Sequence, residues 1–70
     1  MKRVLVTGSS GHLGEALVRT LTDRGVDAIG LDLRPSRWTH AVGSVGDDGL
    51  VRELLAGVDV VMHAATLHKP

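Results

Sequence analysis

The apolar positions near the start of the chain form a short run and then a helical stripe. The run Val4-Leu5-Val6 stands directly before a glycine, and continuous apolar runs are typical of strands buried on both faces of a parallel sheet. The stripe has the i, i+3, i+4, i+8 spacing of one helix face and consists of Leu13, Ala16, Leu17 and Leu21. Gly25 stands beyond it, where a left-handed residue often ends a helix. The pattern therefore predicts a strand followed by a helix.

The rest of the chain repeats this alternation. A second strand is expected at residues 26–33, ended by Arg34-Pro35, because proline restricts the residue before it. A short third strand is expected at residues 41–45, since the link to it is too short for a helical crossover. Residues 58–65 are apolar enough to be a further strand.

A second helix is expected between the last two strands. Asp47 or Asp48 can cap its start, and Gly57 ends it. Its apolar stripe consists of Leu50, Val51, Leu54 and Leu55.

This order of elements predicts the front of a doubly wound α/β sheet. Right-handed crossovers place the four strands in the order 3-2-1-4. Ligands bind such sheets beyond the carboxyl ends of the central strands, here at Thr7-Gly8 and at residues 63–66.

Composition narrows the class of protein. The chain has 70 residues and no cysteine, so it predicts one small unit without disulfides, in keeping with a cytoplasmic setting. Eight basic and eight acidic residues balance, so neither nucleic acid nor an anionic membrane is expected as a partner. No apolar run is long enough for a secretion signal or a membrane span.

The glycines of "VTGSSGHLG" indicate a phosphate-binding turn. Gly8 would let the chain turn off the strand, Gly11 would leave the backbone open to a phosphate, and Gly14 would let helix and sheet pack closely. The first amides of the helix would then face the anion. No lysine follows, so this is not a nucleoside-triphosphate loop, and the two serines do not match a hydrolase nucleophile motif.

Asp32 strengthens this interpretation. It ends the second strand 18 residues after Gly14, where a carboxylate can accept hydrogen bonds from a ribose 2′-hydroxyl. The alternative is an ordinary polar residue at the end of a strand.

Three motifs in order resemble the N-terminal part of the extended short-chain dehydrogenase/reductase superfamily, in its NAD-dependent epimerase/dehydratase group. They are "TGSSGHLG", "LDLR" and "GVDVVMHAAT". The resemblance covers essentially the whole chain and implies a partial NAD(P)-binding Rossmann domain over residues 1–70. The cofactor-binding residues expected on this basis are Thr7, Gly8, Gly11, His12, Leu13, Gly14, Asp32, Arg34, Ser44, Val45, Ala64 and Ala65.

The resemblance has two departures. Gly43-Ser44-Val45 stands where the family commonly has Gly-Asp-Leu, so Ser44 offers a hydroxyl toward the adenine in place of a carboxylate. Thr66 replaces the second alanine of the later motif, a small residue for a small residue.

Asp32 favours NAD, because a fixed carboxylate would repel the 2′-phosphate of NADP. Arg34 and Arg37 follow closely and could attract that phosphate, so NADP stays open. The histidines share no zinc-like spacing, and we expect His63 to be hydrogen-bonded within the structure. Trp38 could shield the adenine or cover the sheet edge.

The family's Tyr-x-x-x-Lys catalytic pair is missing, since the chain has no tyrosine and its lysines are Lys2 and Lys69. No catalytic residue is therefore assigned, and the 70 residues alone are expected to be inactive. The resemblance implies a longer parent enzyme that transfers hydride between a nicotinamide and a small, sugar-like or nucleotide-linked substrate. A non-catalytic dinucleotide-binding or regulatory module, completed by self-association through the edge of the last strand, and an inert fragment are the alternatives.

Overall fold

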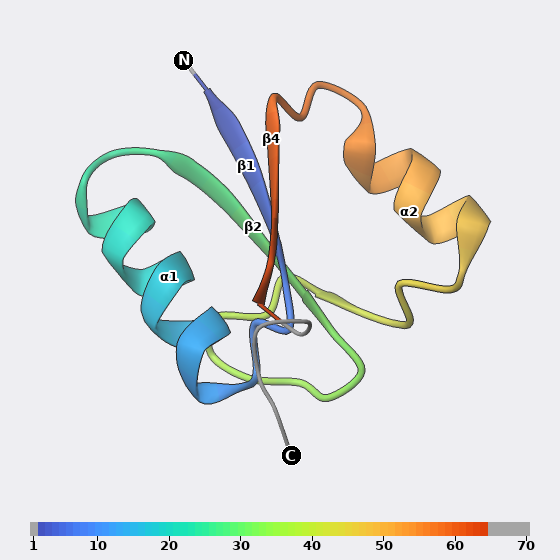
Figure 1. The fold of residues 1–70 in the computed structure, drawn as a ribbon, viewed down its shortest axis with the longest axis horizontal. Helices are drawn as coiled ribbons and strands as arrows, with labels where there is room; N and C mark the ends of the chain where they lie inside the picture. Colours follow the sequence, from blue (N-terminus) through green and yellow to red (C-terminus); the bar gives the residue numbers. More distant parts are fainter. Residues whose placement is uncertain (1, 65–70) are drawn as a thin grey trace.

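The computed structural model describes residues 2–64, which form a parallel sheet with helices on both sides (Figure 1). Its strand order, β3-β2-β1-β4, confirms the predicted order, and each neighbouring pair is parallel. The elements are β1 (Arg3–Thr7), α1 (His12–Asp23), β2 (Asp27–Asp32), β3 (Ala41–Val42), α2 (Asp48–Leu55) and β4 (Val60–His63).

The centre of the fold is β1, which is paired on both edges and buried on both faces. Val4, Leu5 and Val6 are each at most 5% exposed, as the apolar run predicted. Val4 and Val6 belong to the cluster packed against α1, whereas Leu5 points to the opposite face, toward α2. Figure 1 shows α1 and α2 on opposite sides of the strands.

The buried face of α1 keeps part of the predicted stripe, because Leu17 and Leu21 pack against the core cluster. Val18 is fully buried, whereas Leu13, which was expected on the inner face, is 43% exposed. The reason is Gly14, which lies against the turn after β1 and brings the line through Gly14 and Val18 onto the sheet. Leu13 is one residue out of that line and borders the cleft described below.

The end of α1 sets the start of β2. Gly25 has a φ of +78°, which confirms the expected left-handed residue, and the Val26 amide donates to the carbonyl of Leu21. Val26 therefore still belongs to the helix end, and β2 begins at Asp27 rather than at residue 26. At its other end β2 stops at Asp32, because β3 offers no partner beyond Val42.

The third strand is shorter than predicted, with two residues, Ala41–Val42, instead of residues 41–45. The Gly43 amide still donates to the Asp32 carbonyl, but a Cβ at Gly43 would lie 2.3 Å from a methyl of Leu50. The chain turns away there to begin α2. Asp47 caps this helix, since its carboxylate accepts a hydrogen bond from the Leu50 amide.

The second helix is only partly covered, and none of its residues is fully buried. The side chains of its predicted stripe face the sheet only in part, and Leu55 is 40% exposed. Neither helix within residues 2–64 is long and apolar enough to span a lipid bilayer.

The fourth strand is also shorter than the predicted residues 58–65. The Val58 amide donates to the Leu55 carbonyl, so Val58 still belongs to the turn after α2. Within residues 2–64, β4 pairs only with β1. Self-association through its other edge stays a prediction.

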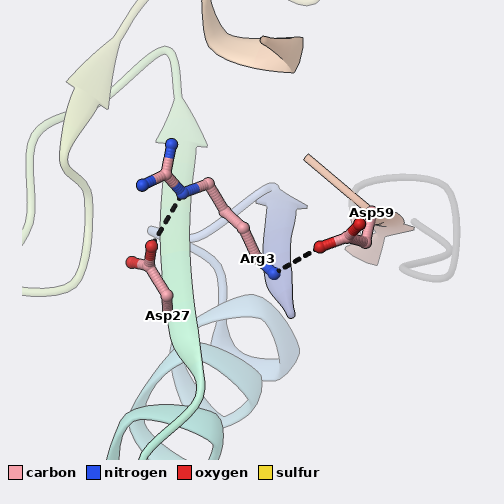
Figure 2. A network of polar contacts seen from close by, with 3 residues as sticks. All are labelled: Arg3, Asp27 and Asp59. Carbon is pink, nitrogen blue, oxygen red and sulfur yellow. Dashed lines mark hydrogen bonds and ion pairs between the residues drawn. The ribbon is translucent and has the colours of Figure 1, made fainter. Parts of the chain in front are cut away.

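Polar contacts of Arg3 hold the amino ends of three strands together (Figure 2). Its guanidinium Nε forms a 2.7 Å ion pair with Asp27 at the start of β2. Its amide donates to the Asp59 carboxylate at 2.9 Å, and the Asp59 amide donates back to the Arg3 carbonyl. These contacts lie at the end of the sheet opposite the glycine turn.

Candidate functional site

The chain leaves β1 through a tight turn at Gly8. Gly8 has a φ of +80°, which side chains rarely allow, and its amide donates to the Leu31 carbonyl at 2.7 Å. The Ser9 amide donates to the same carbonyl, and the Gly11 amide donates to the Gly8 carbonyl. The turn is thereby fixed at the carboxyl ends of β1 and β2.

Gly14 brings α1 against this turn. A Cβ at Gly14 would lie 1.9 Å from the Gly8 carbonyl oxygen, which confirms that this glycine permits close packing. Gly11 is the N-cap residue and has no side chain that could accept from the first helical amides. The amides of His12 and Leu13 begin the helix and have no intrahelical acceptor, so they are available to an anion.

Asp32 is held in place by the backbone around it. One carboxylate oxygen accepts from the Ser10 amide and the other from the Arg34 amide, both at 3.0 Å. The carboxylate is therefore fixed beside the glycine turn, and its remaining lone pairs can accept from a diol. Asp32 is half-exposed, so a ligand in solution can reach it.

A cleft of about 410 Å³ joins the glycine turn to the end of β2. It brings together eight of the twelve predicted cofactor-binding residues with Ser10. Its lining residues are Gly8, Ser10, Gly11, His12, Leu13, Gly14, Asp32, Arg34 and Ala64.

A second hollow of about 130 Å³ shares Gly8 and Asp32 with the cleft and contains Ser44 and Val45. The Ser44 hydroxyl accepts from the Gly46 amide, and both Ser44 and Val45 are exposed. Both residues were expected at the adenine end of the cofactor. Whether they contact a cofactor stays a prediction.

Thr7 does not line the cleft. It is 2% exposed, and its hydroxyl is 3.0 Å from Nδ1 of His63, so β1 and β4 are joined at their carboxyl ends. This contact confirms His63 as a hydrogen-bonded residue of the fold. Ala65 and Thr66 lie outside the described residues.

The arginines and the tryptophan divide into two groups. Arg34 lines the cleft, whereas the Arg37 guanidinium lies 5.4 Å from the centre of the Trp38 ring. Trp38 packs against the core cluster beneath α1 and lines neither hollow. Of its two predicted roles, covering the sheet is the one that its position supports.

Four hydroxyl groups meet in a cluster that the sequence did not predict. The hydroxyls of Ser9, Ser10 and Ser36 all lie within 2.9 Å of the Thr39 hydroxyl. No sequence signal connects these residues, because the turn and residues 36–39 meet only in the fold. Within residues 2–64, no three acidic, histidine or cysteine side chains lie close enough to hold a metal ion.

The parallel sheet, the glycine turn and the fixed Asp32 carboxylate define a Rossmann-like domain with a cleft suited to an anion and a diol. The sequence model of the NAD dependent epimerase/dehydratase family matches residues 4–70. The chain belongs to this family, which confirms the resemblance read from the three motifs.

Solved and curated relatives agree with this assignment. A crystal structure of a short-chain dehydrogenase/reductase superfamily protein from Agrobacterium tumefaciens with bound NAD superposes with a TM-score of 0.80. It is 40% identical in sequence, and the match covers 87% of this chain and 19% of that one.

Two curated relatives carry different names. A 3-beta-hydroxysteroid dehydrogenase of Mycolicibacterium neoaurum is 38% identical over 93% of this chain and 19% of its own length. A UDP-glucose 4-epimerase of Azospirillum brasilense is 33% identical over 90% of this chain and 21% of its own length. The chain thus spans about a fifth of the length of these relatives.

Proposed function

We propose that this chain is the dinucleotide-binding part of an NAD-dependent epimerase, dehydratase or oxidoreductase. The amides of His12 and Leu13 bind the diphosphate, and Gly8, Gly11 and Gly14 keep side chains away from it. Asp32 accepts hydrogen bonds from the adenosine ribose, and the hollow at Ser44 and Val45 receives the adenine. The observation that carries the proposal is that the fixed Asp32 carboxylate and the start of α1 border one cleft.

The proposal for the cofactor is NAD. A carboxylate whose two oxygens already accept backbone amides cannot turn away from a 2′-phosphate, so the extra negative charge of NADP is disfavoured. Arg34 is the cleft's only arginine within the described residues and provides the remaining route to NADP. The NAD bound in the Agrobacterium structure supports the same choice.

For the whole protein, we propose hydride transfer between the nicotinamide and a small molecule. The names of the relatives extend from a steroid to a nucleotide sugar, and the epimerase relative supports a sugar-like substrate. The family's tyrosine and lysine pair has no counterpart in this sequence, which has no tyrosine. The 70 residues by themselves should therefore bind the cofactor without turning over substrate.

The test compares NAD and NADP by isothermal titration calorimetry on the unaltered protein and on Asp32→Ala. We expect NAD to bind more tightly than NADP, and Asp32→Ala to weaken NAD about tenfold or more while affecting NADP much less. Hydrogen bonds to a charged acceptor contribute about 1.5–3 kcal/mol, which is why the loss should be at least tenfold. Asp23→Ala, at the far end of α1, is the matched control.

A second variant tests the charge of Asp32. Asp32→Asn removes the charge and keeps one oxygen, which can accept from only one of the Ser10 and Arg34 amides, so it should narrow the difference in affinity between NAD and NADP. An equal loss for both cofactors in Asp32→Ala would refute the ribose assignment.

A further inference from the structure

The hydroxyl cluster of Ser9, Ser10, Ser36 and Thr39 joins the glycine turn to the segment that follows Asp32. Thr39 is its centre, with oxygen–oxygen distances of 2.5 Å to Ser9, 2.8 Å to Ser10 and 2.9 Å to Ser36. Ser9 belongs to the glycine turn and is fully buried. Ser36 and Thr39 belong to the segment that follows Asp32 and leads to β3.

The direction of every hydrogen bond in this cluster follows from the donor count. A hydroxyl has one proton to donate, and Ser10 donates its proton to the Arg34 carbonyl, which can only accept. The contact between Ser10 and Thr39 must therefore use the proton of Thr39. With that proton committed, Ser9 and Ser36 must both donate to the Thr39 oxygen.

This assignment leaves Thr39 fully used, since its hydroxyl donates once and accepts twice. Ser36 can fill its role because its oxygen also accepts from the Trp38 amide, which leaves its proton for Thr39. The hydrogen bonds therefore all point in one direction. Ser9 and Ser36 donate to Thr39, Thr39 donates to Ser10, and Ser10 donates to the Arg34 carbonyl.

The packing around Gly30 holds the segment over the glycine turn. A Cβ at Gly30 would lie 2.1 Å from the Trp38 carbonyl oxygen and 2.7 Å from the Ser9 side chain, so no other residue fits beneath them. His40 fixes the end of this segment to β2, because its amide donates to the Gly30 carbonyl and its Nδ1 accepts from the Gly30 amide. The segment carrying Thr39 therefore has a fixed position above β2.

We propose that Thr39 is a positioning residue that reinforces the spacing between the glycine turn and Asp32, which the Ser10 amide already links to the Asp32 carboxylate. This inference rests on the proposed function, because it concerns the two halves of the same cofactor site. The half that binds the diphosphate includes Ser9 and Ser10. The half that binds the adenosine ribose begins at Asp32. Because the protons of Ser9 and Ser10 are used by Thr39 and by the Arg34 carbonyl, the diphosphate is left to the backbone amides. Thr39 adds to the backbone contacts that hold those amides relative to the ribose.

The test compares ADP-ribose, which spans both halves, with adenosine, which occupies only the half at Asp32. Thr39→Val keeps the shape of the side chain but removes its donor and acceptor. We expect it to weaken ADP-ribose about tenfold or more while changing adenosine affinity less than about threefold. Thr39→Ser restores the hydroxyl and should bind both ligands as the unaltered protein does, and Thr20→Val on the exposed face of α1 is the matched control.

A ligand-free measurement separates this inference from the proposed function. Amide hydrogen exchange at Ser9 and Ser10 should accelerate about tenfold or more in Thr39→Val and should be unchanged in Thr39→Ser. If the unaltered protein bound neither NAD nor ADP-ribose, the proposed function would be wrong. The positioning role of Thr39 would be wrong as well only if amide exchange at Ser9 and Ser10 were also unchanged in Thr39→Val.

Other outcomes are decisive as well. Equal weakening of ADP-ribose and adenosine in Thr39→Val, or no weakening of either, would overturn the positioning role. If Thr39→Val does not fold, Ser10→Ala removes the acceptor of the Thr39 proton together with the hydrogen bond to the Arg34 carbonyl, and it should give the same preferential loss of ADP-ribose. Unchanged binding in Ser10→Ala would then overturn the proposal.

Discussion

Gly14 shows how one missing methyl group sets the geometry of the site. Its hydrogen occupies the position where a Cβ would lie 1.9 Å from the Gly8 carbonyl oxygen. The helix start can approach the turn only because that space is empty, and the amides of His12 and Leu13 reach the cleft as a result. This role could be read from the sequence, because the glycine spacing itself requires a turn and a close helix.

We expect Gly14→Ala to lower the free energy of unfolding by about 3 kcal/mol, since the added carbon forces α1 away from backbone atoms that cannot yield. Gly25→Ala is the matched comparison. Its Cβ would meet nothing within 4 Å, so only its φ of +78° opposes the change, at a cost of about 1 kcal/mol. Urea denaturation of both variants measures the difference, and equal losses would contradict the packing role.

The contacts within the hydroxyl cluster could not be predicted from the sequence. Ser9 and Thr39 are 30 positions apart, and neither belongs to a motif that names the other. Their contact depends on how residues 36–39 fold back over Gly30, which no local pattern specifies. The prediction for Leu13 was wrong for a related reason. Helical spacing placed Leu17 and Leu21 correctly against the core, but it does not show that Gly14 and Val18 face the sheet at the start of the helix while Leu13 is exposed.

At the scale of elements, types were predictable and ends were not. The hydrophobic periodicity predicts which segments are helices and which are strands. However, β2 and β4 both start later than predicted, because the amides of Val26 and Val58 form hydrogen bonds within the turns that follow α1 and α2. The third strand stops at Val42, since Gly43 packs under Leu50. In each case a contact from another element decides the boundary.

The cap of α2 gives a test at this scale. The sequence allowed Asp47 or Asp48, and the structure selects Asp47, whose carboxylate accepts from the Leu50 amide at 3.1 Å. Asp47→Ala should lower the free energy of unfolding by about 1 kcal/mol, because this helix has no fully buried residue to compensate. Asp48→Ala loses only an interaction with the helix dipole, about 0.5 kcal/mol. Thermal unfolding followed by circular dichroism ranks the two, and a larger loss in Asp48→Ala would contradict the assignment.

At the scale of the molecule, sheet topology determines where a ligand can bind. The order β3-β2-β1-β4 puts the carboxyl ends of β1, β2 and β4 at one edge, and the cleft lies there. The opposite end of the sheet carries the polar contacts of Arg3 (Figure 2), which join the starts of the strands. Strand order and cleft location both followed from the order of elements, because right-handed crossovers leave one arrangement.

The most direct test of the central claim is an NMR titration of the ¹⁵N-labelled protein with ADP-ribose and, separately, with adenosine. We predict that ADP-ribose shifts the amide signals of His12 and Leu13 together with those around Asp32, whereas adenosine shifts only the latter. This difference would place the diphosphate on the first amides of α1. Shifts at His12 and Leu13 no larger than those in α2, or identical patterns with the two ligands, would contradict the account.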